Sequence, residues 1–333
     1  MAVYTHLDRA AMAGILSHYD IGRMISASGI AEGVSNSNWL VETSGSSAGS
    51  QFVLTMYERR IDVADLPFFL ALLDHLAARG CPVPPTVHTT RGEAFLDIGG
   101  KAVALIRFLP GSVVEQPTAA QARSVGRALA AMHTAAAEFP LRREQRLGPS
   151  AWRTLLEQCG SCGLEAIDPS LAAAMWDELT HLELRWPRLL PTGVIHSDLF
   201  PDNVLVQGDE VTGLLDFYFA ANDFLAYDLA VTHAAWSFAP DGRQFRPEIS
   251  TALLDGYAQV RPLERAELDA LPDLVRGACV RFIASRAFDW IDTPTDALVR
   301  RKDPVEFLHR LHFYRQHGAS IFTSPSGGAK AGA

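Results

Sequence analysis

The chain contains few of the residues that define several protein classes. Four cysteines among 333 residues are too few for a disulfide framework, and only three lysines are present. Cys159 and Cys162 form one CxxC segment, but no second pair with the spacing of zinc ligands follows it. We therefore expect reduced thiols, and neither a structural zinc site nor a redox centre.

Charge and hydropathy exclude two kinds of partner. The formal net charge is −9, and no stretch resembles the basic stripe with which proteins neutralise nucleic-acid phosphates. No uninterrupted apolar run is long enough to span a bilayer, and the N-terminus lacks the cationic and apolar segments of a secretion signal. These features predict a cytoplasmic protein that binds neither nucleic acid nor membrane, and they leave the oligomeric state open.

The composition nevertheless indicates a globular protein, since 48% of the residues are hydrophobic and 20% are charged. A chain of this length is expected to form two lobes. Up to Pro110 the expected strands are 22–31, 37–43, 51–58, 93–98 and 101–108, and the expected helices are 8–18 and a segment from Asp65 to Gly80 with Pro67 near its start. Beyond Pro110 helical periodicity dominates, near 118–137, 151–160, 170–186, 224–238, 247–259, 265–291 and 303–316.

One extended island interrupts these helices and carries polar residues at the ends of short strands. The segment HSDLFPDN contains Asp198 and Asn203, and LLDF contains Asp216. Phosphoryl transfer from a nucleotide needs a carboxylate that orients the attacking hydroxyl or accepts its proton, and oxygen ligands that hold magnesium against the phosphates. Asp198 suits the first task, and Asn203 and Asp216 suit the second. Such residues also form turns, but three of them, each attached to its own strand, favour a catalytic site.

These segments are similar to the catalytic and metal-binding motifs of the aminoglycoside phosphotransferase and choline kinase superfamily. The resemblance covers nearly the whole chain and implies an α+β, protein-kinase-like two-lobed fold. It implies an N-terminal antiparallel sheet lobe with one long helix, which binds the nucleotide (1–106), a hinge (107–111), and a mainly α-helical C-terminal lobe for catalysis and substrate binding (112–320). Residues 321–333 are low in complexity and are expected to form a disordered tail.

The resemblance also implies roles for individual residues, with ATP as the phosphoryl donor and Mg²⁺ as the metal. Asp198 is similar to the catalytic aspartate of the family, and Asn203 and Asp216 are similar to its magnesium ligands. His196 matches the motif histidine, which we interpret as a structural brace. Asp228, in AYDLA, resembles the aspartate that supports the catalytic loop from the following helix.

The N-terminal lobe is expected to bind the nucleotide. The segment GIAEGVSNSNW lies where this fold places a strand, a loop and a strand over the phosphates, although such a segment is a plain hairpin about as often. Glycine permits the turn there, and hydroxyl and backbone N–H groups suit phosphate oxygens. The candidate contacts are Gly33, Ser35, Asn36 and Ser37 for the phosphates and, by resemblance, Arg107 to Leu109 for the adenine.

The third strand departs from the family pattern. Kinases of this fold usually place a lysine there, facing the phosphates, whereas FVLTMYERR has Thr55. The lysines of the chain are Lys101, Lys302 and Lys330. Either Thr55 suffices with magnesium, or Arg59, Arg60 or another cation substitutes. A catalytically inactive, nucleotide-binding pseudokinase is a further alternative.

Dispersed segments resemble the homoserine kinase branch of this superfamily. They are VYTHL, YDIG, GIAEGVSNSNW, LTMYERR, LLDFYFAANDFLAYDLAVTHAAW and RFIASRAFDW. The resemblance implies phosphorylation of the side-chain hydroxyl of L-homoserine by ATP, on the route to threonine. Small-molecule kinases for choline, an aminoglycoside or another amino alcohol are the alternatives.

An amino-acid substrate needs a cation for its carboxylate and an acceptor for its ammonium group. Arg281, Ser285 and Asp289 are spaced i, i+4 and i+8 and share one face of a predicted helix, so they are candidate substrate contacts. An Arg and Asp pair that only rigidifies the helix explains the same spacing. Tyr218 and Trp236 are further candidates for the pocket, although tryptophan is also common in cores.

Overall fold

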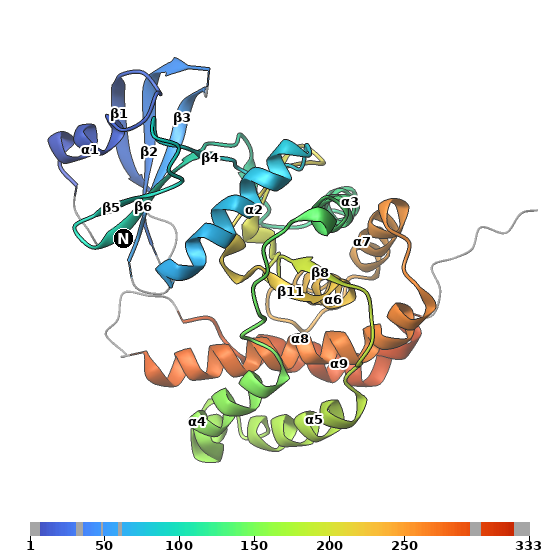
Figure 1. Cartoon of the computed structure of the whole chain (residues 1–333). Helices are drawn as coiled ribbons and strands as arrows, with labels where there is room; N and C mark the ends of the chain where they lie inside the picture. The colour runs from blue at the N-terminus through green and yellow to red at the C-terminus, as the bar shows by residue number, and fades with distance from the viewer. Residues whose placement is uncertain (1–6, 31–35, 48, 59–61, 294–300, 323–333) are drawn as a thin grey trace, which may run out of the picture.

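The computed structural model describes residues 7–30, 36–47, 49–58, 62–293 and 301–322. Within these residues a sheet-rich N-terminal part and a larger helical part lie against each other (Figure 1). The expected α+β architecture, with an antiparallel sheet before a helical C-terminal part, is confirmed. The boundaries predicted for the lobes and the hinge stay predictions.

The N-terminal sheet is antiparallel throughout, in the order β1-β2-β3-β6-β4, with β5 paired to β6. The strands are β1 (Met24–Ile30), β2 (Asn36–Ser46), β3 (Gly49–Tyr57), β4 (Thr86–Val87), β5 (Leu96–Ile98) and β6 (Lys101–Arg107). Alternate side chains of β3, those of Phe52, Leu54 and Met56, are buried on one side of the sheet. They pack with Met12 of helix α1 (Arg9–Leu16), so this part has its own core.

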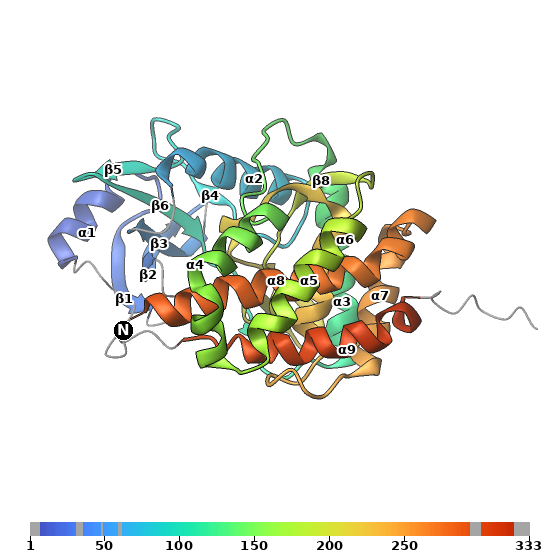
Figure 2. The ribbon, with the colours of Figure 1, turned by 90° about the horizontal axis from the view of Figure 1, so that it is seen from below.

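The helical part contains the expected helices. They are α3 (Ala119–Ala135), α4 (Pro149–Ile167), α5 (Leu171–Arg185), α6 (Leu225–Trp236), α7 (Pro247–Val260), α8 (Arg265–Asp292) and α9 (Val305–Ile321). The long helix α8 packs against both α4 and α9 (Figure 2). The sequence predicts that α4 ends at 160, but it continues to Ile167 beyond a kink at Gly160, where φ is 65°. Glycine adopts this left-handed conformation without strain.

Helix α2 (Leu66–Ala78) lies between the sheet and the helical part (Figure 1). Pro67 occupies its first turn, where a missing N–H is tolerated. Its buried leucines and phenylalanines belong to a core that they share with α3 and α7 and with Tyr57, Ala102 and Ala104 of the sheet, separate from the core that contains α1. Just before it, the Asp65 carboxylate accepts hydrogen bonds from Arg143 at 2.9 Å and Arg146 at 3.0 Å. Both apolar and ionic contacts therefore attach α2 to the helical part.

Two small sheets inside the helical part hold the loops of the predicted motif. One consists of β7 (Ser112–Val113), β9 (Val204–Gln207) and β10 (Glu210–Leu214), and the other of β8 (Thr192–Ile195) and β11 (Ala221–Phe224). Strands β8, β9 and β10 match the short strands that the sequence predicts. It does not predict β4, β7 and β11.

Residues 321 and 322, which the sequence assigns to a disordered tail, belong to the folded structure. Ile321 ends α9, and the next residue, Phe322, is only 4% exposed. The ring centres of Phe322 and His233 lie 5.0 Å apart within the helical core. The hydrophobic contact explains the longer helix, since the end of α9 can bury a large aromatic ring. Residues 323–333 lie outside the described residues.

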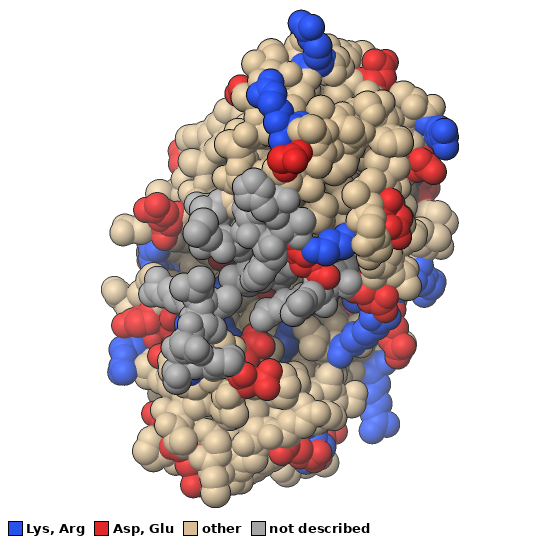
Figure 3. Space-filling model, turned by 90° about the vertical axis from the view of Figure 1, so that its left-hand side faces the viewer, with Lys and Arg blue, Asp and Glu red and all other residues tan. Residues whose placement is uncertain are grey.

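The described helices and the surface charge bear on whether the protein could contact a membrane or a nucleic acid. Among the described helices, none is long and apolar enough to cross a membrane. On the face shown in Figure 3, lysine and arginine side chains alternate with aspartate and glutamate side chains, and the described residues of that face form no continuous basic area.

Helices α3 and α7 approach each other closely because each has a glycine at the contact. A Cβ atom on Gly126 of α3 would lie 2.2 Å from the carbonyl oxygen of Leu253, and one on Gly256 of α7 would lie 2.1 Å from the carbonyl oxygen of Arg123. Both neighbours are backbone atoms of helices, so they cannot rotate away. The two glycines therefore set the separation of α3 and α7.

We expect Gly126→Ala to destabilise the protein by about 1–3 kcal/mol or more, because the added methyl group forces the two helices apart. Gly14→Ala, in α1, is the matched control, since a Cβ atom there would meet no heavy atom within 4 Å. The control should gain up to about 1 kcal/mol from helix propensity. Urea denaturation measures both changes, and equal midpoints for the two variants would contradict the proposed close contact.

Candidate active site

The structure brings together the residues of the predicted catalytic and metal-binding motif. Asp198 follows β8, Asn203 ends a one-turn 3-10 helix, and Asp216 follows β10. The side-chain amide of Asn203 donates to the backbone oxygen of Asp198 at 2.8 Å and to its carboxylate at 3.3 Å. The backbone N–H of Leu215 donates to the backbone oxygen of Asn203 at 2.9 Å. Hydrogen bonds therefore connect the two loops that carry the three side chains.

Each of these two loops contains a residue in the left-handed conformation. Ser197 (φ 69°) and Asp216 (φ 62°) are the non-glycine residues with positive φ in the described ranges. Such a conformation costs on the order of 1–3 kcal/mol per residue and persists only where neighbouring contacts impose it. The contacts that impose it on Ser197 come from α6 and α8.

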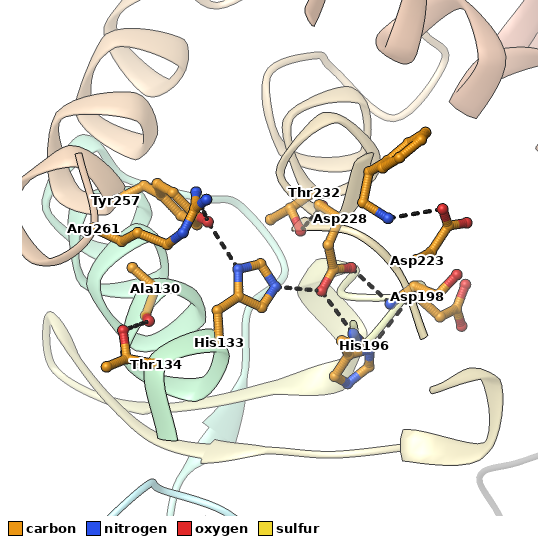
Figure 4. Close-up of polar contacts among 12 residues, drawn as sticks. Ala130, His133, Thr134, His196, Asp198, Asp223, Asp228, Thr232, Tyr257 and Arg261 are labelled. Atoms are coloured by element: carbon orange, nitrogen blue, oxygen red, sulfur yellow. Dashed lines mark hydrogen bonds and ion pairs between the residues drawn. The ribbon is translucent and has the colours of Figure 1, made fainter. Parts of the chain in front are cut away.

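Asp228 of α6 holds the backbone of the loop after β8 (Figure 4). Its fully buried carboxylate accepts the backbone N–H groups of His196 at 2.6 Å and Ser197 at 2.7 Å, and the Nε2–H of His133 at 2.9 Å. Burial by itself raises the pKa of Asp228, but the hydrogen bond from His133 and the neighbouring charges outweigh it and lower the pKa overall. Asp228 is therefore ionised at neutral pH and fixes two consecutive backbone groups.

His196 connects the loop of Asp198 to the loop of Asp216. Its Nε2–H donates to the carbonyl oxygen of Leu215 at 2.8 Å, and its Nδ1 accepts the backbone N–H of Asp198 at 3.2 Å. Burial lowers the pKa of His196 below its ordinary value, so the ring is neutral, with one nitrogen donating and the other accepting. The ring makes no contact with solvent.

The guanidinium group of Arg281 lies against the same loop rather than in an open pocket. It donates to the carbonyl oxygen of Ser197, and to its Oγ at 3.1 Å, and the side chain is 2% exposed. The guanidinium carbon is 4.6 Å from the ring centre of Phe282 and 5.6 Å from that of Phe219. Arg281 therefore binds the acceptor atoms of the left-handed Ser197, whereas Asp228 binds its N–H group.

The other predicted substrate residues of α8 differ from Arg281 in their surroundings. Ser285 is half-buried and its hydroxyl donates to the carbonyl oxygen of Phe282 at 3.4 Å, whereas Asp289 is exposed. The predicted common face thus runs from the buried active-site loop to the exposed end of the helix. The described contacts do not join the three side chains into one polar cluster.

The two predicted aromatic residues of the pocket support neighbouring structure. Trp236 is fully buried, and its indole N–H donates to the carbonyl oxygen of Leu199 at 2.9 Å, just after Asp198. The hydroxyl of Tyr218 donates to that of Tyr57 at 3.1 Å, so it connects the loop of Asp216 to the end of β3. The buried position of Trp236 does not favour direct contact with a substrate.

The predicted nucleotide contacts lie at the ends of strands in the sheet. Asn36 and Ser37 begin β2 and are buried, and the Ser37 hydroxyl donates to Glu58 at 2.8 Å. Arg107 ends β6, and Leu109 follows it as a half-buried residue. The predicted residues Gly33, Ser35, Arg59 and Arg60 lie outside the described residues.

Thr55 makes a contact that differs from that of a phosphate-binding lysine. It is 3% exposed, and its hydroxyl donates to the side-chain oxygen of Asn38 on the neighbouring strand at 2.8 Å. Lys101, at the start of β6, forms an ion pair with Glu58. The strand β3, Gly49–Tyr57, contains no lysine or arginine.

The electrostatics of the two motif aspartates differ from those of ordinary surface carboxylates. Burial raises the pKa of Asp198 to about 7, although the positive charge of Arg281 acts against this increase. The carboxylate of Asp216 is exposed toward the solvent, yet the protein around it removes enough water to raise its pKa as well. Neither carboxylate forms an ion pair with a described residue. Such groups have a pKa that suits proton transfer or metal binding.

The donor set of this site fits a magnesium ion. Asn203 uses its side-chain N–H groups on Asp198, which leaves its side-chain carbonyl oxygen without a hydrogen bond to a described residue. This oxygen and the carboxylate of Asp216 are hard ligands, which Mg²⁺ prefers.

Two side chains near the loops were not predicted from the sequence. The amide of Gln145 donates to Oγ of Ser197 at 3.3 Å. The Nζ atom of Lys302 lies 3.6 Å from Oδ2 of Asp202, between Pro201 and Asn203 in the chain. Both come from segments far from the motif in sequence, so no local pattern indicates them. The scarcity of lysine was the one signal that could have directed attention to Lys302.

Comparison with known proteins identifies close relatives. The model of the phosphotransferase enzyme family matches residues 26–263. A homoserine kinase of Azorhizobium caulinodans is 48% identical over 315 residues, which cover 95% of this chain and 96% of that protein. A homoserine kinase of Methylobacterium radiotolerans is 48% identical over 316 residues, which cover 95% of this chain and 97% of that protein.

Solved structures with low sequence identity share the fold. Spectinomycin phosphotransferase, in complex with ADP and spectinomycin, has a TM-score of 0.72 at 13% identity and covers 95% of this chain and 100% of its own. Choline kinase from Cryptosporidium parvum has a TM-score of 0.69 at 13% identity, and the match covers 95% of this chain and 98% of the choline kinase chain. These two structures show that the fold is shared. The match to the family model and the 48% identity to a homoserine kinase show that this chain is related by descent to those proteins. The chain therefore belongs to the phosphotransferase enzyme family, in the group of the homoserine kinases.

Proposed function

We propose that this protein transfers the γ-phosphoryl group of ATP to the side-chain hydroxyl of L-homoserine and so forms O-phospho-L-homoserine. The acceptor follows from the homoserine kinases, which match nearly the full length of the chain at 48% identity. The observation that carries the chemistry is the Asp198 carboxylate, which has no cationic partner among the described residues and is oriented by Asn203.

Asp198 acts as the base in this proposal. Its carboxylate accepts a hydrogen bond from the acceptor hydroxyl and takes the proton as the oxygen attacks the γ-phosphorus. Because burial raises its pKa to about 7, Asp198 has a proton affinity suited to this task near neutral pH. Asp228 and Arg281 keep the loop in place by binding its backbone, and they do not contact the reacting atoms.

Asn203 and Asp216 are the proposed magnesium ligands. Bound Mg²⁺ supplies positive charge that neutralises the phosphate oxygens. The link from His196 to Leu215 keeps the Asp216 loop at a fixed position relative to Asp198. Asn36, Ser37 and the backbone from Arg107 to Leu109 complete the proposed nucleotide site, under the sheet lobe 1–106.

The alternatives predict different substrates. The structures of a spectinomycin phosphotransferase and a choline kinase share the fold at 13% identity, far below the 48% of the homoserine kinases. The reason for considering an inactive nucleotide-binding protein is Thr55, which stands where related kinases have a lysine and which is hydrogen-bonded to Asn38. It would bind ATP without transferring phosphate to any alcohol.

We expect ATP-dependent turnover with L-homoserine and little with choline or aminoglycosides. Asp198→Asn should lower kcat by about 10²–10⁴-fold, because it removes the base, and should leave ATP binding intact. Asp209→Asn, the same change at an exposed residue of the turn between β9 and β10, is the matched control. A coupled ADP assay measures all three proteins.

Two results would contradict parts of this proposal. Turnover of another alcohol but not of L-homoserine would refute the acceptor and leave the kinase chemistry intact. Full activity of Asp198→Asn would refute the role of Asp198.

The role of Arg281 gives a prediction about pH. Its positive charge lowers the pKa of Asp198, so Arg281→Gln should raise that pKa, and the acidic limb of kcat/KM should move to higher pH. Since Ser197 also loses a donor, kcat should fall by about tenfold or more at pH 7. We expect a KM for L-homoserine within about threefold of wild type, because the guanidinium is buried.

Arg281→Lys, which retains the charge, is the control and should keep the acidic limb in place. Steady-state kinetics from pH 5 to 9 distinguish this positioning role from substrate binding. A large rise of KM for L-homoserine with an unchanged pH profile would instead indicate that Arg281 binds the carboxylate of the substrate.

A further inference from the structure

The proposed chemistry requires positive charge near the transferring phosphoryl group, and the sheet supplies none from β3. Thr55 occupies the expected place and is hydrogen-bonded to Asn38. Lys101 is paired with Glu58. Among the lysines in the described part of the chain this leaves Lys302, which is encoded about a hundred residues after the catalytic motif.

Lys302 lies beside the catalytic loop. Its Nζ atom is 5.6 Å from the ring centre of Phe200, two residues after Asp198, and 3.6 Å from the carboxylate of Asp202, one residue before Asn203. Burial raises the pKa of both motif aspartates, and the charge of Lys302 acts against this increase at each of them. Its amine is therefore close to the proposed base and to the proposed metal ligands at once.

The backbone that carries Lys302 is anchored, while its side chain is largely exposed. Arg286 of α8 donates to the carbonyl oxygen of Asp303 at 2.9 Å and pairs with Glu306 of α9 at 2.6 Å. The side chains of Lys302 and Asp202 are 64% and 63% exposed. An ion pair with this exposure contributes little, so it does not prevent the amine from binding another anion.

We propose that the ammonium group of Lys302 binds the phosphoryl group during its transfer and so replaces the cation that β3 lacks. The inference rests on the proposed kinase function. In this step the hydroxyl oxygen forms a bond to the γ-phosphorus while the bond to the β,γ-bridging oxygen breaks. ADP leaves with the electron pair, Asp198 receives the proton, and Lys302 stays protonated throughout.

A carboxylate of the acceptor is the other anion that Lys302 would attract. The observations favour the phosphoryl group, because Nζ of Lys302 lies 5.6 Å from the ring centre of Phe200 and 3.6 Å from Asp202, in the segment that joins Asp198 to Asn203. Asp198 is proposed to face the acceptor hydroxyl and Asp216 the metal-bound phosphates, so the transferring group passes between them. An acceptor carboxylate would have no reason to lie near the metal ligands.

Lys302→Met tests the inference, since it removes the charge and keeps the length of the side chain. We expect kcat with L-homoserine to fall by about 10²-fold, as for loss of one donor to a transition-state charge, and KM for L-homoserine to change little. The slow hydrolysis of ATP without an acceptor should fall by a similar factor. Arg265→Met, which removes one positive charge from an 80% exposed side chain of α8, is the matched control and should behave as wild type.

A second acceptor, 3-aminopropan-1-ol, distinguishes the two anions because it is homoserine without its carboxylate. If Lys302 binds the phosphoryl group, Lys302→Met loses the same factor with both acceptors. If the loss appears as a higher KM for L-homoserine and vanishes with 3-aminopropan-1-ol, Lys302 binds the carboxylate and the inference is overturned. Activity of Lys302→Met equal to wild type also overturns it.

The same variants separate this inference from the proposed function. Turnover of a different alcohol by the wild-type protein would refute the acceptor, but the fall in ATP hydrolysis in Lys302→Met would still support the role of Lys302. No hydrolysis and no transfer by the wild-type protein would refute both. Lys302→Arg, which keeps the charge, should recover at least part of the lost kcat.

Discussion

The hydrogen bonds of Asp228 are the interaction on which the rest of the site depends. The loop after β8 must turn through a left-handed serine to present Asp198, and that conformation is unfavourable by itself. A buried carboxylate that accepts two consecutive N–H groups fixes the backbone on one side, and the guanidinium of Arg281 fixes it on the other. Because Asp228 and Arg281 lie on different helices, α6 and α8, the loop that carries Asp198 is formed correctly only when the helical core is packed.

The burial of Asp228 also explains the polar residues that extend behind it. An unpaired carboxylate in the core would be very unfavourable, so its two oxygens need hydrogen-bond donors. His133 of α3 supplies one, and the hydroxyl of Tyr257 in turn donates to the other ring nitrogen at 2.8 Å. Tyr257 lies on α7, beside the glycine contact that brings α3 and α7 together. The close helix packing and the polar chain therefore support the same loop.

The sequence predicts much of this arrangement because the information is local. Asp198, Asn203 and Asp216 stand at fixed offsets beside short strands, and the long helices show a clear period. Arg281 could be predicted only in part. The sequence shows its position on a helix face, but not its contact with Ser197, which lies 84 residues earlier in the chain. Trp236 is similar, since only the packed structure reveals that Leu199 accepts its N–H group. Lys302 reaches the site through tertiary contacts alone.

The location of these groups has a consequence for motion between the lobes. Asp198, Asn203, Asp216 and Lys302 all belong to the helical part, and Arg286 anchors the segment before α9 to α8. In a kinase with a lysine on β3, movement of the sheet changes the distance between that cation and the catalytic base. Here the proposed cation and base are held by one core, so sheet movement would reposition the nucleotide and leave their spacing unchanged. The contact of Tyr57 with Tyr218 is then where the sheet meets this fixed unit, at the loop that carries Asp216.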